Sequence, residues 1–207
     1  MERGRAILVP PAGSCRGASA RLDNGFPMPS SDSRFRSALA AAAALVLAAC
    51  SPTFNWREVP IADAGLVVLL PCKPDRAQRA LPLGAESVQV DMAGCETGGA
   101  TFAVAHASAS SPAQAEAWLK AWRAATRSQL GEAQVSEAPA ALKRATAAPA
   151  PVRLDAQPPR QGAAPVQVLW FAQSKKDGAV SLYQATVLGR PSAPEAANTF
   201  FEGLRLP

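Results

Sequence analysis

Short apolar runs separated by turn residues dominate the chain after residue 55. Gly65–Leu70 is a continuous apolar run ended by a proline, and its length and β-branched content are typical of a buried strand. Other segments alternate apolar with polar residues at every second position, which is typical of strands with one buried face. Such strands are expected at Ser87–Met92, Thr101–His106, Val166–Gln173 and Ala179–Leu188, after a first strand at Trp56–Val59.

Turn residues between these segments predict which strands pair. Lys175–Gly178 ends in Asp-Gly, a strong hairpin signal, so the strands on either side of it are expected to be neighbours. The glycines within Gly94–Gly99 predict a second hairpin, with Cys95 in its connection. Lys73–Ala80 is polar and is expected to end in an irregular turn.

A long amphipathic helix is expected from Pro112 to about Leu130. Ser111 is a suitable N-cap, proline suits the first helical position, and Gly131 ends the helix. Trp118 and Trp122 recur at helical spacing and share one stripe. This stripe is either an aromatic ligand-binding face or the face that packs on the sheet, and packing is favoured.

The order of the elements predicts the fold class. Residues 137–165 are rich in Ala and Pro and predict a loop, with weak strands at Leu142–Ala147 and Val152–Leu154. Pro194 begins a last helix with an apolar face of Ala197, Phe200, Phe201 and Leu204. Strands, helix, strands and helix indicate an α+β domain, an antiparallel sheet of about five to seven strands with two main helices packed on it.

The N-terminal part of the chain has the layout of a secretory signal. Two arginines, Arg34 and Arg36, precede the apolar run Ala38–Ala49. A transmembrane anchor or a buried helix is the alternative, but about 12 residues are too few where roughly 20 are needed to span a bilayer. The run ends in Leu47-Ala48-Ala49-Cys50, which resembles the lipobox of a bacterial lipoprotein precursor.

This resemblance implies a fate for Cys50. The chain would be cut between Ala49 and Cys50, the thiol would carry a diacylglycerol, and the new amino group would be acylated. Two or more acyl chains anchor a protein stably to a membrane. Ser51 in the next position implies transfer to the outer membrane, so the expected location is its periplasmic face.

The signal also divides the chain. Met28 is a better start for a short signal, so residues 1–27 are a doubtful extension and residues 28–49 the cleaved signal peptide. Residues 50–55 would form a lipidated tether, and residues 56–207 one α+β domain facing the periplasm. Six of the 21 basic and three of the 16 acidic residues precede Cys50, so the net charge falls from +5 to about +2. No basic cluster with interleaved aromatics remains, and nucleic-acid binding has no support.

The four cysteines have different expected roles. Cys15 leaves with the leader and Cys50 carries lipid, which leaves Cys72 and Cys95. An even pair in an oxidising compartment predicts a disulfide, with two free thiols as the alternative. A redox site would need Cys-x-x-Cys spacing, and a metal site would need partners that the sequence lacks.

Candidate catalytic chemistry is sparse. His106 is the only histidine, and a lone histidine beside apolar strand positions is more often structural than catalytic. Asp91 or Glu96 could assist it in acid–base work, but no motif supplies a nucleophile, a phosphate loop or a metal-ligand set. We therefore predict no cofactor.

The domain itself also resembles known families. Gly65–Pro74 and Gly94-Cys95-Glu96 are similar to segments of small lipoproteins of Gram-negative bacteria, and the order of elements resembles the PsbP/Mog1-like fold. Leu70–Pro74 occupies the place of that fold's proline-rich turn, and Phe200–Leu204 the place of its terminal helix. Members of that family mostly assist or bind other proteins.

These observations predict an envelope lipoprotein anchored through Cys50 that binds or helps to assemble an envelope protein partner. The first alternative is a cryptic enzyme or small-ligand binder that uses His106 with Asp91 or Glu96. The second is a structural or stress-tolerance factor of the envelope with no discrete ligand.

Overall fold

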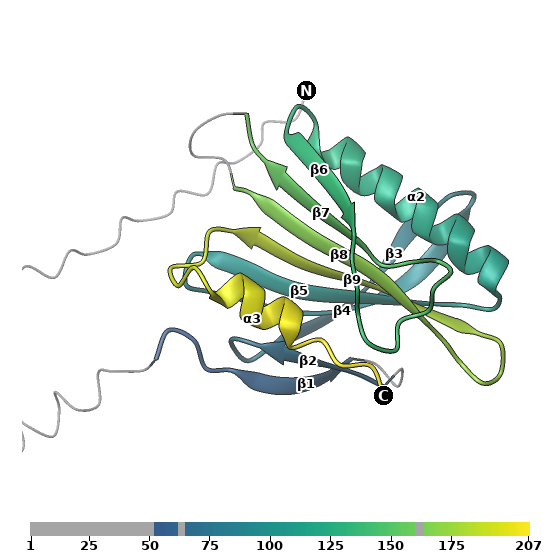
Figure 1. The fold of residues 1–207 in the computed structure, drawn as a ribbon, viewed down its shortest axis with the longest axis horizontal. Helices are drawn as coiled ribbons and strands as arrows, with labels where there is room; N and C mark the ends of the chain where they lie inside the picture. Colours follow the sequence, from purple (N-terminus) through teal and green to yellow (C-terminus); the bar gives the residue numbers. More distant parts are fainter. Residues whose placement is uncertain (1–51, 62–64, 160–163) are drawn as a thin grey trace, which may run out of the picture. The chain divides into compact units, whose positions relative to one another are not determined.

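Seven antiparallel strands form the central sheet of the described chain (Figure 1). In spatial order they are β3 (Asp75–Leu83), β4 (Glu86–Thr97), β5 (Ala100–Ala109), β9 (Val180–Gly189), β8 (Val166–Ser174), β7 (Val152–Gln157) and β6 (Gln134–Pro139). A separate hairpin of β1 (Arg57–Ile61) and β2 (Leu66–Leu70) and two helices, α2 (Pro112–Leu130) and α3 (Ala196–Glu202), complete the fold. This arrangement confirms the predicted α+β class.

The computed structural model describes residues 52–61, 65–159 and 164–207. The predicted extension, the signal peptide, Ala49 and Cys50 therefore lie outside the described residues. No helix of the described segments is long and apolar enough to cross a bilayer.

One face of the sheet is covered by α2. Ser111 caps this helix, and its side chain accepts a hydrogen bond of 3.2 Å from the backbone N–H of Gln114, as the sequence predicted. Trp118 and Trp122 are buried among apolar residues of the central strands, including Leu182 on β9. The tryptophan stripe therefore packs on the sheet.

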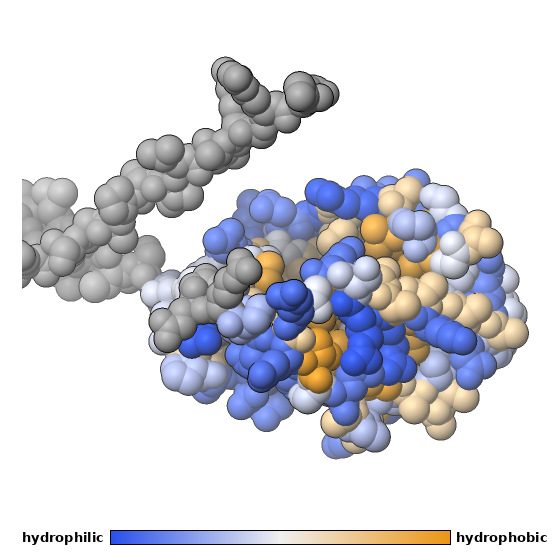
Figure 2. Space-filling view, turned by 90° about the horizontal axis from the view of Figure 1, so that it is seen from above, coloured by the Kyte–Doolittle hydropathy of each residue, from blue (hydrophilic) through white to orange (hydrophobic). Residues whose placement is uncertain are grey.

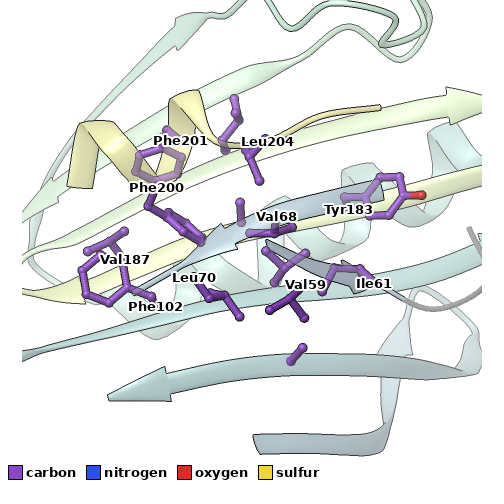
Figure 3. Close-up of a cluster of buried hydrophobic side chains, with 14 of the residues drawn as sticks. Val59, Ile61, Val68, Leu70, Phe102, Tyr183, Val187, Phe200, Phe201 and Leu204 are labelled. Carbon is purple, nitrogen blue, oxygen red and sulfur yellow. The ribbon is translucent and has the colours of Figure 1, made fainter. Parts of the chain in front are cut away.

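The opposite face is covered by the β1–β2 hairpin and α3. Figure 3 shows the apolar side chains of the hairpin in one buried cluster with side chains of the sheet, among them Phe102, Val187 and Tyr183. Phe200 of α3 packs edge-on against Phe102, with 5.6 Å between ring centroids. After α3 the chain pairs with β2, where Arg205 and Val67 exchange two backbone hydrogen bonds of 2.9 Å. A side chain at Gly203 would clash with Leu69 on β2, so this close approach requires glycine.

A disulfide joins the hairpin to the central sheet. Cys72 follows β2 and Cys95 lies on β4, and their sulfur atoms are bonded at 2.03 Å. The predicted pairing of these cysteines is confirmed. A hydrogen bond of 2.9 Å from Arg76 of β3 to the backbone carbonyl of Pro60 adds a second link between the hairpin and the sheet.

Two predictions at the β3–β4 side of the sheet are wrong. Lys73–Ala80 does not end in an irregular turn, because β3 begins at Asp75 and pairs with β4 along its length. Almost all β3 side chains are exposed, so this edge strand has no alternation for a sequence pattern to detect. Cys95 is inside β4 and not in a connection, since Gly98 and Gly99 alone form the turn.

The Ala/Pro-rich region 137–165 is also more ordered than predicted. It begins within β6 and contains β7, whose first residues confirm the strand expected at Val152–Leu154. The strand expected at Leu142–Ala147 is absent, and these residues form turns that connect β6 to β7. Glu137 of β6 contacts Arg123 of α2 at 2.6 Å, an ion pair that the sequence pattern does not show.

The surface is largely polar. Leu188 is the only large hydrophobic side chain of the described residues that is exposed, at 43%. On the face shown in Figure 2, hydrophilic side chains separate small hydrophobic areas, and no broad apolar patch is visible.

Replacing both disulfide cysteines, in a Cys72→Ser/Cys95→Ser variant, should lower the free energy of unfolding by about 3 kcal/mol. The bridge joins positions 23 residues apart, and loops of this size lose roughly that much chain entropy when closed. Thermal unfolding should begin roughly 6–12 °C lower for a domain of this size. Equal melting temperatures of the two proteins under oxidising conditions would contradict this role.

Candidate functional site

A row of polar and aromatic side chains crosses the face of the sheet that the hairpin covers. Asp91 of β4 is opposite His106 of β5, and His106 is opposite Tyr183 of β9. Tyr183 is in turn opposite Phe171 of β8, and Gln78 of β3 extends the row beyond Asp91. Because directly opposite residues of antiparallel strands point to the same face, the strand register brings these side chains together.

His106 and Asp91 form a pair at one end of this row. The distance between His106 Nδ1 and Asp91 Oδ2 is 3.7 Å, too long for a hydrogen bond. Gln78 Nε2 donates to the other carboxylate oxygen of Asp91 at 2.6 Å. The histidine is only 6% exposed, and neither of its ring nitrogens has a hydrogen-bond partner within the described parts of the chain. A buried histidine without hydrogen bonds is unusual, since buried polar atoms nearly always find a partner.

Burial is the main influence on the pKa values of His106 and Tyr183. Removal from water lowers the pKa of His106, and the nearby Lys175 ammonium lowers it further, although the Asp91 carboxylate opposes both effects. Burial also raises the pKa of Tyr183 to about 12. At neutral pH the imidazole and the phenol are therefore both uncharged.

A cleft opens where β4 leaves β5. The pairing of these strands ends at Asp91 and His106, although β4 continues back to Glu86 and β5 forward to Ala109. The gap between them is a cleft of about 420 Å³ that Asp91, His106 and Trp118 help to line. The first turn of α2 borders it, where Gln114 Nε2 donates to Glu86 at 3.1 Å.

The cleft has the features of a small binding site. Its volume is within the range of ligand pockets in general. The indole Nε1–H of Trp118 is buried without a hydrogen-bond partner in the described structure, as are both nitrogens of His106. Glu86 and Gln114 also line the cleft, and the sequence did not predict this. They are distant in sequence, and the position of α2 over the sheet brings them together.

Among the residues that the structure describes, no nucleophile is hydrogen-bonded to His106 Nε2. His106 Nε2 has no hydrogen-bond partner in the described segments, so no described hydroxyl is placed for activation by this imidazole. Glu96 cannot assist it, because Glu96 lies five residues from Asp91 on the same strand and points to the opposite face. Of the two acids that the sequence offered, the structure brings only Asp91 to His106. In the described residues no three potential ligands cluster to hold a metal ion.

A scan against protein-family models finds no match for this chain, and a search of curated proteins finds no significantly similar sequence.

The burial of His106 predicts a pH-dependent stability. Its pKa is lower in the folded protein than in the unfolded chain, so the unfolded chain binds the proton more readily. The stabilisation is complete above the unfolded value of about 6.5 and is lost as the pH falls below it. The free energy of unfolding should therefore decrease between pH 7.5 and 5.5, by at most about 1.4 kcal/mol per pH unit from this group.

Urea unfolding of the wild type and a His106→Gln variant at several pH values measures this effect. The variant keeps a neutral side chain and should have a flatter pH profile in this range. If the free energy of unfolding changes equally with pH in the two proteins, protonation of His106 is not the cause of the pH dependence.

Proposed function

We propose that this chain is a lipid-anchored protein of the bacterial envelope that acts by binding a partner and not by catalysis. The lipobox-like residues Leu47–Cys50 supply the anchor, and the Cys72–Cys95 disulfide fits an oxidising compartment. The lack of a described hydroxyl at His106 Nε2 favours binding over hydrolysis.

The observation that carries this proposal is the short distance along the chain from Cys50 to the folded domain. The Thr53 carbonyl accepts a hydrogen bond of 2.5 Å from the Thr97 hydroxyl, and the Asn55 N–H donates to the Pro71 carbonyl at 2.7 Å. Phe54 stacks on Trp56 with 6.1 Å between ring centroids. Half of the predicted tether 50–55, namely Thr53, Phe54 and Asn55, is therefore part of the domain.

Only two residues, Ser51 and Pro52, would then separate a lipidated Cys50 from Thr53, so the two positions are three residue steps apart along the chain. A fully extended chain of that length spans at most about 11 Å. Such an anchor would hold the β4–β5 turn, at Gly98 and Gly99, close to the bilayer. A lipoprotein with so short a tether presents its opposite end to the periplasm.

The His106 cleft is at that opposite end. β5 starts beside the Gly98–Gly99 turn and reaches His106 after six further residues, which corresponds to about 20 Å of strand. The cleft would thus be accessible to a periplasmic partner while the other end of the domain faces the membrane. This polarity fits a binding or assembly role at the outer membrane.

Lipidation predicts that a Cys50→Ser variant remains an unprocessed precursor and incorporates no labelled fatty acid. The hydroxyl of serine cannot replace the thiol that receives the diacylglycerol. A Ser51→Ala variant is the matched control and should be labelled and processed normally. Normal labelling of Cys50→Ser would refute the anchor.

Binding at the cleft predicts a discrete crosslink in intact cells. A photoreactive phenylalanine analogue at Gln89, an exposed residue lining the cleft, should give one reproducible protein adduct. The same analogue at exposed Lys176, on the β8–β9 turn, should not give that adduct. Absence of an adduct specific to Gln89 in repeated experiments would count against a protein partner at this end.

The second candidate is a small-ligand binder that uses His106 with Asp91. It is favoured by the buried nitrogens of His106 and Trp118, which have no hydrogen-bond partner in the described structure and belong to two residues that line the cleft. This candidate gives no protein adduct at Gln89, and ligand binding would shift the indole N–H resonance of Trp118.

A further inference from the structure

A second and larger depression lies away from the cleft, between the β6–β7 connection and the C-terminal segment. In Figure 1 this connection descends across the front of the sheet to the region where the chain ends. The depression, called here the basic groove, has a volume of about 750 Å³. Its apolar lining comes from the connection, β8 and the end of the chain, through Leu142, Leu169, Phe201, Leu204 and Leu206.

Basic side chains surround this apolar lining. Lys143, Arg144, Arg153 and Arg205 all border the groove, against one acidic residue, Glu202. Two of the cations are neutralised by neighbours. Arg153 contacts Asp155 at 3.1 Å, and Arg205 contacts Glu58 at 2.5 Å.

The other two cations are uncompensated. Lys143 and Arg144 are exposed, and neither has an ion-pair partner in the part of the chain that the structure describes. Both lie on the β6–β7 connection, at the rim of the groove. An apolar lining with two free positive charges at its edge is complementary to an anionic amphiphile.

The backbone at Arg144 is a second indication. Its φ angle is 65°, and it is the only described residue other than glycine with a positive φ. Arg144 lies in a turn closed by a hydrogen bond of 3.2 Å from the Ala145 N–H to the Leu142 carbonyl. Glycine or asparagine usually occupies such a position, because a β-carbon is strained there. An arginine in its place keeps a cation at the groove at a cost in stability.

The guanidinium group of Arg153 packs directly on the apolar lining of the groove. Its guanidinium carbon lies 3.9 Å from the centroid of the Phe201 ring. The guanidinium group lies against the ring while its Nε and Nη2 donate to Asp155 within its own plane. An anionic head group beside Lys143 and Arg144 would therefore lie near both charge and apolar surface.

We propose that the basic groove binds an anionic lipid with a single acyl chain and a phosphate head group. The chain would contact Leu142, Leu204 and Leu206, and the phosphate would contact Lys143 and Arg144. An acidic peptide would satisfy the charges but would leave the apolar lining without a long hydrocarbon partner. This proposal does not depend on the lipidation of Cys50, and each can fail without the other.

Native mass spectrometry of the full chain in a neutral detergent tests the proposal, with lysophosphatidylglycerol as the probe. The wild type should bind this lipid at least tenfold more tightly than lysophosphatidylcholine with the same acyl chain. Glycerol phosphate, which has the charge without the chain, should bind at least tenfold more weakly than the lipid. Equal affinity for the two lipids, or equal affinity for the lipid and glycerol phosphate, would overturn the proposal.

Charge variants locate the site. A Lys143→Gln/Arg144→Gln variant should bind lysophosphatidylglycerol at least tenfold more weakly than the wild type. Lys176→Gln/Arg79→Gln is the matched control, because it removes the same charges from exposed positions of the β8–β9 turn and β3. The proposal fails if both double variants bind alike.

A third variant separates binding from folding. Arg144→Gly removes one cation and also relieves the backbone strain, so its melting temperature should equal or exceed that of the wild type. It should nevertheless bind the lipid more weakly. Wild-type affinity in this variant would show that Arg144 has no part in lipid binding.

Discussion

The fold depends on the need to cover both faces of the central strands. On β9, Tyr183 and Val187 point to one face and Leu182 to the other, and all three are buried. An antiparallel sheet often leaves one face to water, but this one cannot without exposing a large apolar area. The helix α2 covers one face, whereas the other face needs a hairpin, a short helix and the C-terminal segment, with a disulfide to hold the hairpin in place.

Both candidate sites lie where these covering elements end. The His106 cleft opens where β4 separates from β5 and the first turn of α2 only partly closes the gap. The basic groove forms where the β6–β7 connection meets the segment after α3. The end of the domain at Thr53 and Gly98 is by contrast tightly packed, since a side chain at Gly98 would clash with Phe54. The domain thus has one tightly packed end and recesses elsewhere.

The sequence predicted what local rules determine. Ser111, Pro112 and Gly131 define α2, and two cysteines remaining after removal of a leader predict a disulfide that the structure contains. The sequence did not predict the edge strand β3, because this strand pairs through its backbone and most of its side chains are exposed. It did not predict β6 either, because this strand runs into the Ala/Pro-rich segment. The choice between Asp91 and Glu96 depends on strand register, which a single sequence does not reveal. The basic groove is lined by residues that are distant in sequence, so no sequence motif indicates it.

We propose that Cys50 anchors the domain directly to a membrane. The most direct measurement is mass spectrometry of the N-terminal peptide of the protein isolated from native envelopes. We expect a peptide that begins at Cys50 and carries the mass of a diacylglycerol and an additional acyl chain. A peptide that continues from Ala49 into an unmodified Cys50 would contradict the account.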